Sequence, residues 1–192
     1  TNGRVQLYGN DLTNKQEHEI ARAGIGRKFQ VPSVFKHLSV AQNLEVAAIA
    51  TRSYGVLGNL RNRIRKRARV AEVLELTGLS GRAEEVAGQL SHGETQWLEL
   101  GLLIIQDPKV VLLDEPTAGM TQAETGKTAE IITSLKGRHT LIVVEHDMAF
   151  VRRIAERITV MDMGRFLAEG TIEQIETNPD VKEAYLGSGG IH

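Results

Sequence analysis

An apolar strand that ends in two carboxylates constrains this chain more than any other feature of its sequence. Residues 110–113 are Val-Val-Leu-Leu, and Asp114, Glu115 and Pro116 follow directly. Such a run is typical of a strand buried in a parallel sheet, where ligands bind beyond the carboxyl ends of the strands. One acid could hold a Mg²⁺ ion there while the other polarises an attacking water, as phosphoryl transfer requires. A structural strand that ends in an acidic turn before a proline explains the same residues. The other segments of the chain are therefore needed to choose between a catalytic site and a structural turn.

A predicted helix start lies upstream of this strand. Ser91 and Glu94 have the spacing of a capping box. Apolar residues and a glycine then recur at helical spacing, namely Trp97, Leu98, Gly101, Leu102 and Ile105. A helix N-terminus with a serine hydroxyl and the unhindered Gly93 also suits a phosphate group. For the motif alone, capping is the simpler interpretation.

A second apolar strand is predicted downstream, at residues 141–144, and it runs into Glu145, His146 and Asp147. A lone histidine in this position more often serves the structure than the chemistry. Two adjacent parallel strands that end in Asp114-Glu115 and in His146 would, however, bring these groups to one site. Near the N-terminus, Gln30 stands two residues before Pro32, which stops any continuing strand.

In this order and at these spacings, the motifs resemble those of the ATP-binding subunits of ABC transporters, over essentially the whole chain. The matching segments are Gln30 for the Q-loop, residues 91–94 for the signature motif, residues 110–115 for the Walker B strand and His146 for the switch histidine. The resemblance implies ATP and Mg²⁺ as cofactors. It places Asp114 and Gln30 at the metal, Glu115 as the general base and His146 at the γ-phosphate.

The resemblance also implies partners. Ser91, His92, Gly93 and Glu94 would contact ATP bound by a second ABC ATPase subunit, either identical or paralogous. Transmembrane permease subunits would hold the dimer at the cytoplasmic face of the cell membrane. No nucleic acid partner is implied. The expected function is that of the ATP-hydrolysing subunit of an ABC importer.

The fold class implied is α/β, a P-loop NTPase-like ABC ATPase fold with a mostly parallel sheet and a helical subdomain. Residues 1–30 would be part of the ATPase core up to the Q-loop, 31–104 the helical subdomain with the signature motif, and 105–192 the ATPase core with the Walker B strand, the switch histidine and a C-terminal helix. The resemblance is closest to the group that imports branched-chain amino acids and urea, through residues 24–30, 144–148, 169–171 and 183–187. Residues 91–99 and 118–120 are more similar to the urea branch.

The chain departs from the family pattern at three places. His92 and Glu94 stand where the commonest signature has glycine and glutamine, and Thr121 stands where an aspartate is usual. No Gly-x-x-x-x-Gly-Lys-Ser/Thr phosphate loop, the family's Walker A motif, occurs in the 192 residues, and the chain does not begin with methionine. We therefore expect the N-terminal strand, phosphate loop and helix to be missing. That loss would leave an open position in the sheet and prevent ATP turnover by these residues alone.

The tripeptide Gly126-Lys127-Thr128 matches the last three residues of the phosphate-loop motif. Six residues separate it from the preceding Gly119, where the motif needs four. The residues just before it are predicted to be helical, whereas a phosphate loop follows a strand. We interpret the tripeptide as part of a helix.

Composition narrows the function classes further. The chain has 23 Lys and Arg against 24 Asp and Glu, so no overall positive charge attracts nucleic acid or membrane. It has no cysteine, which excludes disulfide bonds and thiol chemistry. No apolar run reaches the roughly 18 residues that span a bilayer, and membrane attachment would come through a partner.

Residues 31–90 are predicted to be mostly helical, with one amphipathic helix that ends at Gly78. This helix carries a basic run, Arg61, Arg63, Arg65, Lys66, Arg67 and Arg69. The run is either a solvated face or a contact with anionic lipid or the membrane subunit. A hairpin is predicted around Gly164, followed by a helix capped by Thr171 and Gln174.

Two other classes of function remain open. The ATPase head of a DNA-repair or chromosome-structuring protein shares these motifs but would be expected to carry a long heptad insertion, and none is present. A nucleotide-incompetent interaction module, in which the helical subdomain binds a partner, is the second alternative. The cargo, urea or a branched-chain amino acid, would be selected by other components of such a system.

Overall fold

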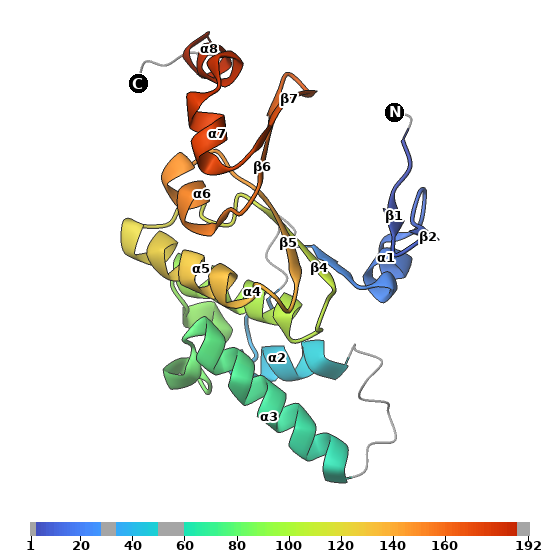
Figure 1. The fold of residues 1–192 in the computed structure, drawn as a ribbon. Coiled ribbons are helices and arrows are strands. Elements are labelled where there is room, and N and C mark those ends of the chain that lie inside the picture. The colour runs from blue at the N-terminus through green and yellow to red at the C-terminus, as the bar shows by residue number, and fades with distance from the viewer. Residues whose placement is uncertain (1–2, 28–33, 50–59, 188–192) are drawn as a thin grey trace. The chain divides into compact units, whose positions relative to one another are not determined.

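The computed structural model describes residues 3–27, 34–49 and 60–187, which form two compact units, one up to Glu145 and one from His146 onward. Figure 1 shows the helices and strands of both units. The predicted Q-loop residue Gln30 lies outside the described residues.

A parallel sheet of three strands forms the centre of the first unit. Its order is β3 (Ile25–Arg27), β4 (Val110–Asp114) and β5 (Thr140–Val144), so that β4 pairs on both sides (Figure 1). Val111 faces Gly26 on one side and Leu141 on the other, and Asp114 faces Val144. Val111 and Leu113 are fully buried. The two apolar runs therefore form adjacent parallel strands, which confirms the prediction made from their sequence.

In the described part of the chain, β5 pairs with β4 alone. The exposed fractions of Ile142 and Val144 are 52% and 60%, which is high for branched apolar side chains on a strand. A free strand edge with exposed apolar residues is a position where a further strand can pair.

The N-terminal segment packs short elements around this sheet. Strands β1 (Gln6–Leu7) and β2 (Asn10–Asp11) form an antiparallel hairpin, and α1 (Glu17–Ala23) leads into β3. The two residues of the hairpin loop, Tyr8 and Gly9, both have positive φ, as the tightest hairpin turns require.

The described residues between 34 and 104 are largely helical, as predicted. They contain α2 (Val40–Ile49), α3 (Leu60–Thr77), the short 3₁₀ helices η2 (Ser80–Arg82) and η3 (Ala87–Gln89), and α4 (His92–Ile104). Helix α3 ends one residue before Gly78, whose φ is +67°. The left-handed conformation favours glycine at this helix end.

Helices α2, α3 and α4 pack closely at Gly101. A Cβ atom added at Gly101 would lie 3.2 Å from Leu44 Cδ2 on α2 and 3.2 Å from Val73 Cγ1 on α3. Leu44 and Val73 are both fully buried. The predicted amphipathic face of α4 therefore faces a core in which a glycine allows the helices to approach.

Helix α5 (Gln122–Ser134) contains the tripeptide Gly126-Lys127-Thr128. The Lys127 ammonium lies 3.7 Å from the centroid of the Trp97 ring, and the Trp97 indole N–H donates to Thr128 Oγ1 at 3.0 Å. Burial lowers the pKa of Lys127. These side chains join α5 to α4, so the interpretation of the tripeptide as part of a helix is confirmed.

The second unit contains α6 (Met148–Ile154), β6 (Ile158–Asp162), β7 (Arg165–Gly170), α7 (Ile172–Thr177) and α8 (Pro179–Gly187). Strands β6 and β7 form the predicted hairpin, which turns at Met163 and Gly164. Thr171 and Gln174 form the predicted capping box at the start of α7. Ala168, Ile175 and Val181 form a small core in this unit. None of the helices in the described ranges is long and apolar enough to cross a membrane.

We expect Leu44→Ala to lower the free energy of unfolding by about 2–5 kcal/mol, because it leaves a cavity where α2, α3 and α4 meet. Val46→Ala, two residues along the same helix, is the matched control, since Val46 is 41% exposed. Urea denaturation monitored by circular dichroism measures both. Equal losses of stability in the two variants would contradict this account of the core.

Candidate functional site

The carboxyl end of β4 presents the two acidic residues singled out from the sequence. Asp114 is the last residue of the strand and is half-buried, whereas Glu115 is exposed. The Glu115 backbone N–H donates to the Val144 carbonyl at 2.9 Å, so the β4–β5 ladder continues one residue past the strand. The sheet therefore fixes the backbone of both acids.

Glu115 has an unusual backbone conformation. Its φ is +43°, in the left-handed region that residues other than glycine rarely adopt. Such a conformation costs on the order of 1–3 kcal/mol and persists where the surroundings hold it, often at functional sites. Here the bond to Val144 and the continuous ladder behind it hold the backbone. The outlier supports the choice of Glu115 as a site residue.

A second acidic residue lies at the end of β5. Glu145 Oε1 accepts hydrogen bonds from the Thr117 backbone N–H at 3.2 Å and from Thr117 Oγ1 at 2.6 Å. These bonds tie the turn after Glu115 to the end of the neighbouring strand. Glu145 was not among the predicted site residues. The signal in the sequence was an acid directly after an apolar strand, next to His146, the residue chosen as the candidate.

His146, the predicted switch histidine, begins the second unit and is exposed. Its neighbour Asp147 caps α6, because Asp147 Oδ1 accepts from the backbone N–H groups of Ala149 at 2.9 Å and Phe150 at 3.2 Å. The convergence of His146 with Asp114 and Glu115 stays a prediction.

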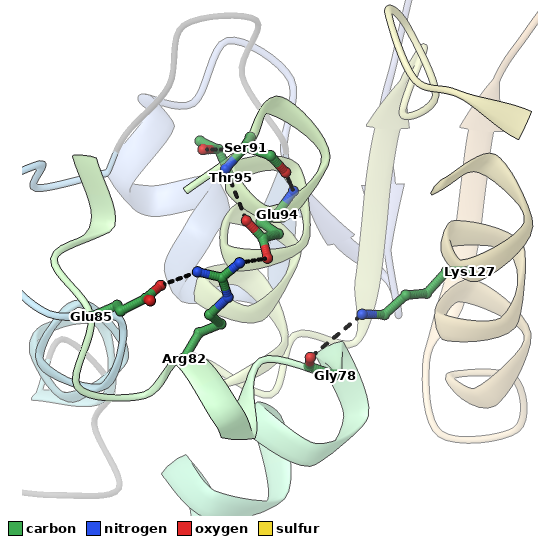
Figure 2. Close-up of polar contacts among 7 residues, drawn as sticks. All are labelled: Gly78, Arg82, Glu85, Ser91, Glu94, Thr95 and Lys127. Carbon is green, nitrogen blue, oxygen red and sulfur yellow. Dashed lines mark hydrogen bonds and ion pairs between the residues drawn. The ribbon is translucent and has the colours of Figure 1, made fainter. Parts of the chain in front are cut away.

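The predicted capping box opens α4. Ser91 Oγ accepts from the Glu94 backbone N–H at 3.2 Å, and Glu94 Oε2 accepts from the Ser91 backbone N–H at 2.9 Å (Figure 2). The Thr95 hydroxyl donates to the Ser91 carbonyl at 2.9 Å. Ser91 and His92 are both exposed. The start of α4 is thus rigid and accessible from solvent.

Arg82 holds the Glu94 side chain from outside the motif. Its guanidinium lies 3.2 Å from Glu94 Oε1 and also pairs with Glu85, and Figure 2 shows it between the two carboxylates. The Glu85 carboxylate raises the pKa of Arg82. Arg82 was not among the predicted site residues, because only the fold brings η2 next to the start of α4.

The start of α4 also contacts the loop that follows the acidic pair. His92 Nε2 lies 3.1 Å from the Ala118 carbonyl oxygen. Gly93 lies against the Glu124 carboxylate so closely that a Cβ atom there would clash. Hydrogen bonds from the Thr121 backbone N–H and hydroxyl hold Glu124 in place and keep its pKa below its usual value. Gly93 therefore allows α4 and α5 to begin side by side.

The chemistry of a metal site is present only in part. Asp114 supplies a half-buried carboxylate, and Mg²⁺ in nucleotide sites is held by one or two such groups together with water and substrate phosphates. No group of three acidic or histidine side chains suited to a metal occurs in the part of the chain that the structure covers. Among the described residues, the end of β4 therefore offers a half-buried carboxylate and no metal cage made of protein side chains alone.

Comparison with known proteins gives the family. Residues 1–118 match the model of the ABC transporter family, and residues 167–191 match that of the branched-chain amino acid ATP-binding cassette transporter.

Two curated relatives are similar along almost the whole chain. The high-affinity branched-chain amino acid transport ATP-binding protein LivG of Escherichia coli K12 is 37% identical, and BraF of Pseudomonas aeruginosa, of the same description, is 35% identical. Each match covers 97% of this chain and 77% of the relative. The ADP conformation of MJ1267, an ATP-binding cassette of an ABC transporter, superposes with a TM-score of 0.77 at 29% identity, over 97% of this chain and 77% of that one. The chain therefore belongs to the ABC transporter family, as an ATP-binding subunit with the ABC ATPase fold.

Proposed function

We propose that this chain is the ATP-binding and ATP-hydrolysing subunit of an importer for branched-chain amino acids or urea. The observation that carries the proposal is the acidic pair at the end of the buried strand β4, with Glu115 held in a left-handed backbone conformation. The similarity to LivG and BraF, whose names specify branched-chain amino acid transport, favours that cargo.

Glu115 would act as the general base that removes a proton from the attacking water. Its exposed side chain and fixed backbone suit this task. Asp114 would hold Mg²⁺, which neutralises charge on the phosphates. Gln30 and His146 would complete the site at the metal and the γ-phosphate. These roles come from the resemblance.

Ser91, His92, Gly93 and Glu94 would contact ATP that is bound by a second ABC ATPase subunit. Solvent exposure of Ser91 and His92 supports this role, because an interface residue must be accessible in the single chain. A helix N-terminus with backbone N–H groups suits a phosphate group. Arg82 would keep the Glu94 side chain in place while the second subunit docks.

The permease subunits need a surface on the helical region. Phe35 on the segment before α2, and Val46 and Ile49 on α2, are exposed apolar residues. Asn43 holds Phe35 to the helix by accepting from its backbone N–H at 2.8 Å and donating to its carbonyl at 3.0 Å. We assign this surface to the permease, which would keep the protein at the cytoplasmic face of the membrane.

A nucleotide-incompetent interaction module remains the second candidate. One observation favours it: Lys127 and Thr128, which resemble the end of a phosphate loop, serve the contact between α4 and α5.

We expect Glu115→Gln to lower the rate of ATP hydrolysis by roughly 10²–10⁴-fold, because the amide cannot accept the proton of the attacking water. Phosphate release by the complete protein assembled with its permease subunits is the measurement. ATP binding, followed with a fluorescent analogue, should persist. Glu75→Gln, an exposed acid on α3, is the control, and an equal loss there would argue against a catalytic role for Glu115.

The 192 residues by themselves should show no measurable ATP turnover. Loss of a single preorganised donor at a reacting oxygen costs roughly 3 kcal/mol, and a missing phosphate loop removes several donors and a lysine. Phosphate release from purified residues 1–192 is compared with that of the Glu115→Gln variant of the same length. A rate that depends on Glu115 would refute this expectation.

Deletion of the gene should abolish uptake of one labelled cargo and spare the other. We expect loss of leucine uptake, measured with radiolabelled leucine and urea in parallel. Return of uptake with the unchanged gene, but not with Glu115→Gln, would link transport to hydrolysis. Selective loss of urea uptake would assign the importer to urea instead, and unchanged uptake of both would favour the interaction module.

A further inference from the structure

Residues 64–68 in the first half of α3 do not take part in the core of their unit. Among the side chains of this helix that the structure describes, which begin at Ile64, the fully or nearly buried ones belong to the second half of the helix and are Val70, Val73, Leu74 and Thr77. In the first half, Ile64 is 61% exposed, and Arg65, Arg67 and Ala68 are exposed as well. Figure 1 shows these first turns at the end of α3 that lies farther from strands β3 to β5. Core packing therefore does not explain the apolar residues here.

The exposed apolar residues form a stripe of their own. Ile64 and Ala68 are four residues apart and share one face of the helix. At 100° per residue, this face is turned by roughly 170° from the face that carries Val70 and Val73. Arg65 and Arg67 lie on either side of the stripe. The first half of α3 is thus a basic amphipathic helix whose apolar stripe points away from the protein core.

The basic charge of this segment is concentrated and largely uncompensated. Six Arg and Lys residues stand between positions 61 and 69, and no acid occurs before Glu72. Because the whole chain has a net charge of −1, the remainder of the chain is acidic overall. Arg69 has a structural role, since it pairs with Glu72 at 2.8 Å and donates to the Ile104 carbonyl at 2.8 Å.

Arg65, Lys66 and Arg67 form no ion pair with any residue that the structure describes. Their charges are therefore available to a partner that approaches this face of α3.

We propose that the first half of α3 binds an anionic lipid surface, with Ile64 and Ala68 at the boundary of the acyl chains and Arg65 and Arg67 on the headgroup phosphates. A helix with a narrow apolar stripe between basic side chains is the form that lies in such an interface. A flat anionic surface contacts the arginines on both sides of the stripe at once, which favours lipid over an acidic protein helix. This contact is independent of ATP and of the proposed function.

The test uses the purified chain and vesicles of phosphatidylcholine with and without phosphatidylserine, in a sedimentation assay at low and high salt. The chain should bind the vesicles that contain phosphatidylserine, and binding should weaken with salt. Substitution of Arg65, Lys66 and Arg67 by glutamine should lower the partition coefficient by roughly tenfold or more. Ile64→Ser should weaken binding at both salt concentrations, because it removes the apolar contact.

A triple variant with the same loss of charge elsewhere is the matched control. Arg22, Lys36 and Lys182 are exposed, and their replacement by glutamine should leave vesicle binding intact. Circular dichroism verifies that every variant is folded. Absence of binding to anionic vesicles, an equal loss in the control, or binding only when permease is present in the vesicles would overturn the proposal.

Discussion

Strand β4 is hydrogen-bonded on both sides in a parallel sheet, and the site depends on this constraint. Because β3 and β5 hold β4 in register, Asp114 stands opposite Val144. The backbone N–H of Glu115 then donates to the Val144 carbonyl and extends the ladder by one residue. A ladder that extends past the strand supplies the support that a left-handed Glu115 needs. The apolar residues that bury β4 therefore contribute to the site as directly as the two carboxylates do, since they fix the backbone from which those carboxylates project.

The turn after the acidic pair connects this strand end to the helix that carries Ser91. Thr117 is hydrogen-bonded to Glu145, the residue after β5, and Ala118 contacts His92 on α4. Glu124 then lies against Gly93. Residues 117–124 thus contact both the end of the sheet, through Thr117, and the start of α4, through Ala118 and Glu124. These contacts therefore join the backbone after the acidic pair to the helix start that is proposed to contact a second subunit.

Local pattern was sufficient to predict the elements whose structure depends on nearby residues. The apolar runs gave β4 and β5, the Ser91–Glu94 spacing gave a capping box, and the position of Gly126 inside a polar periodic segment gave a helix. Arg82 could not be found in this way, because its contact with Glu94 exists only after η2 has packed beside α4. The bond between Thr117 and Glu145 joins residues 28 positions apart and likewise needs the finished sheet.

The unusual signature residues of this chain have a physical explanation in the same contacts. Glycine at position 92 could not reach the Ala118 carbonyl, whereas the imidazole of His92 spans the gap and needs only a proton on Nε2 to donate. Glycine is retained at position 93, where the Glu124 carboxylate leaves no room for a side chain. Glutamate at position 94 serves both the helix cap and Arg82, and its charge gives this ion pair, which the family's usual glutamine could not form. His92 and Glu94 together bond the start of α4 to the loop after β4 and to η2. His92 and Glu94 depart from the usual motif, and both hold the start of α4 in place through contacts within their own subunit. These contacts do not depend on a second subunit.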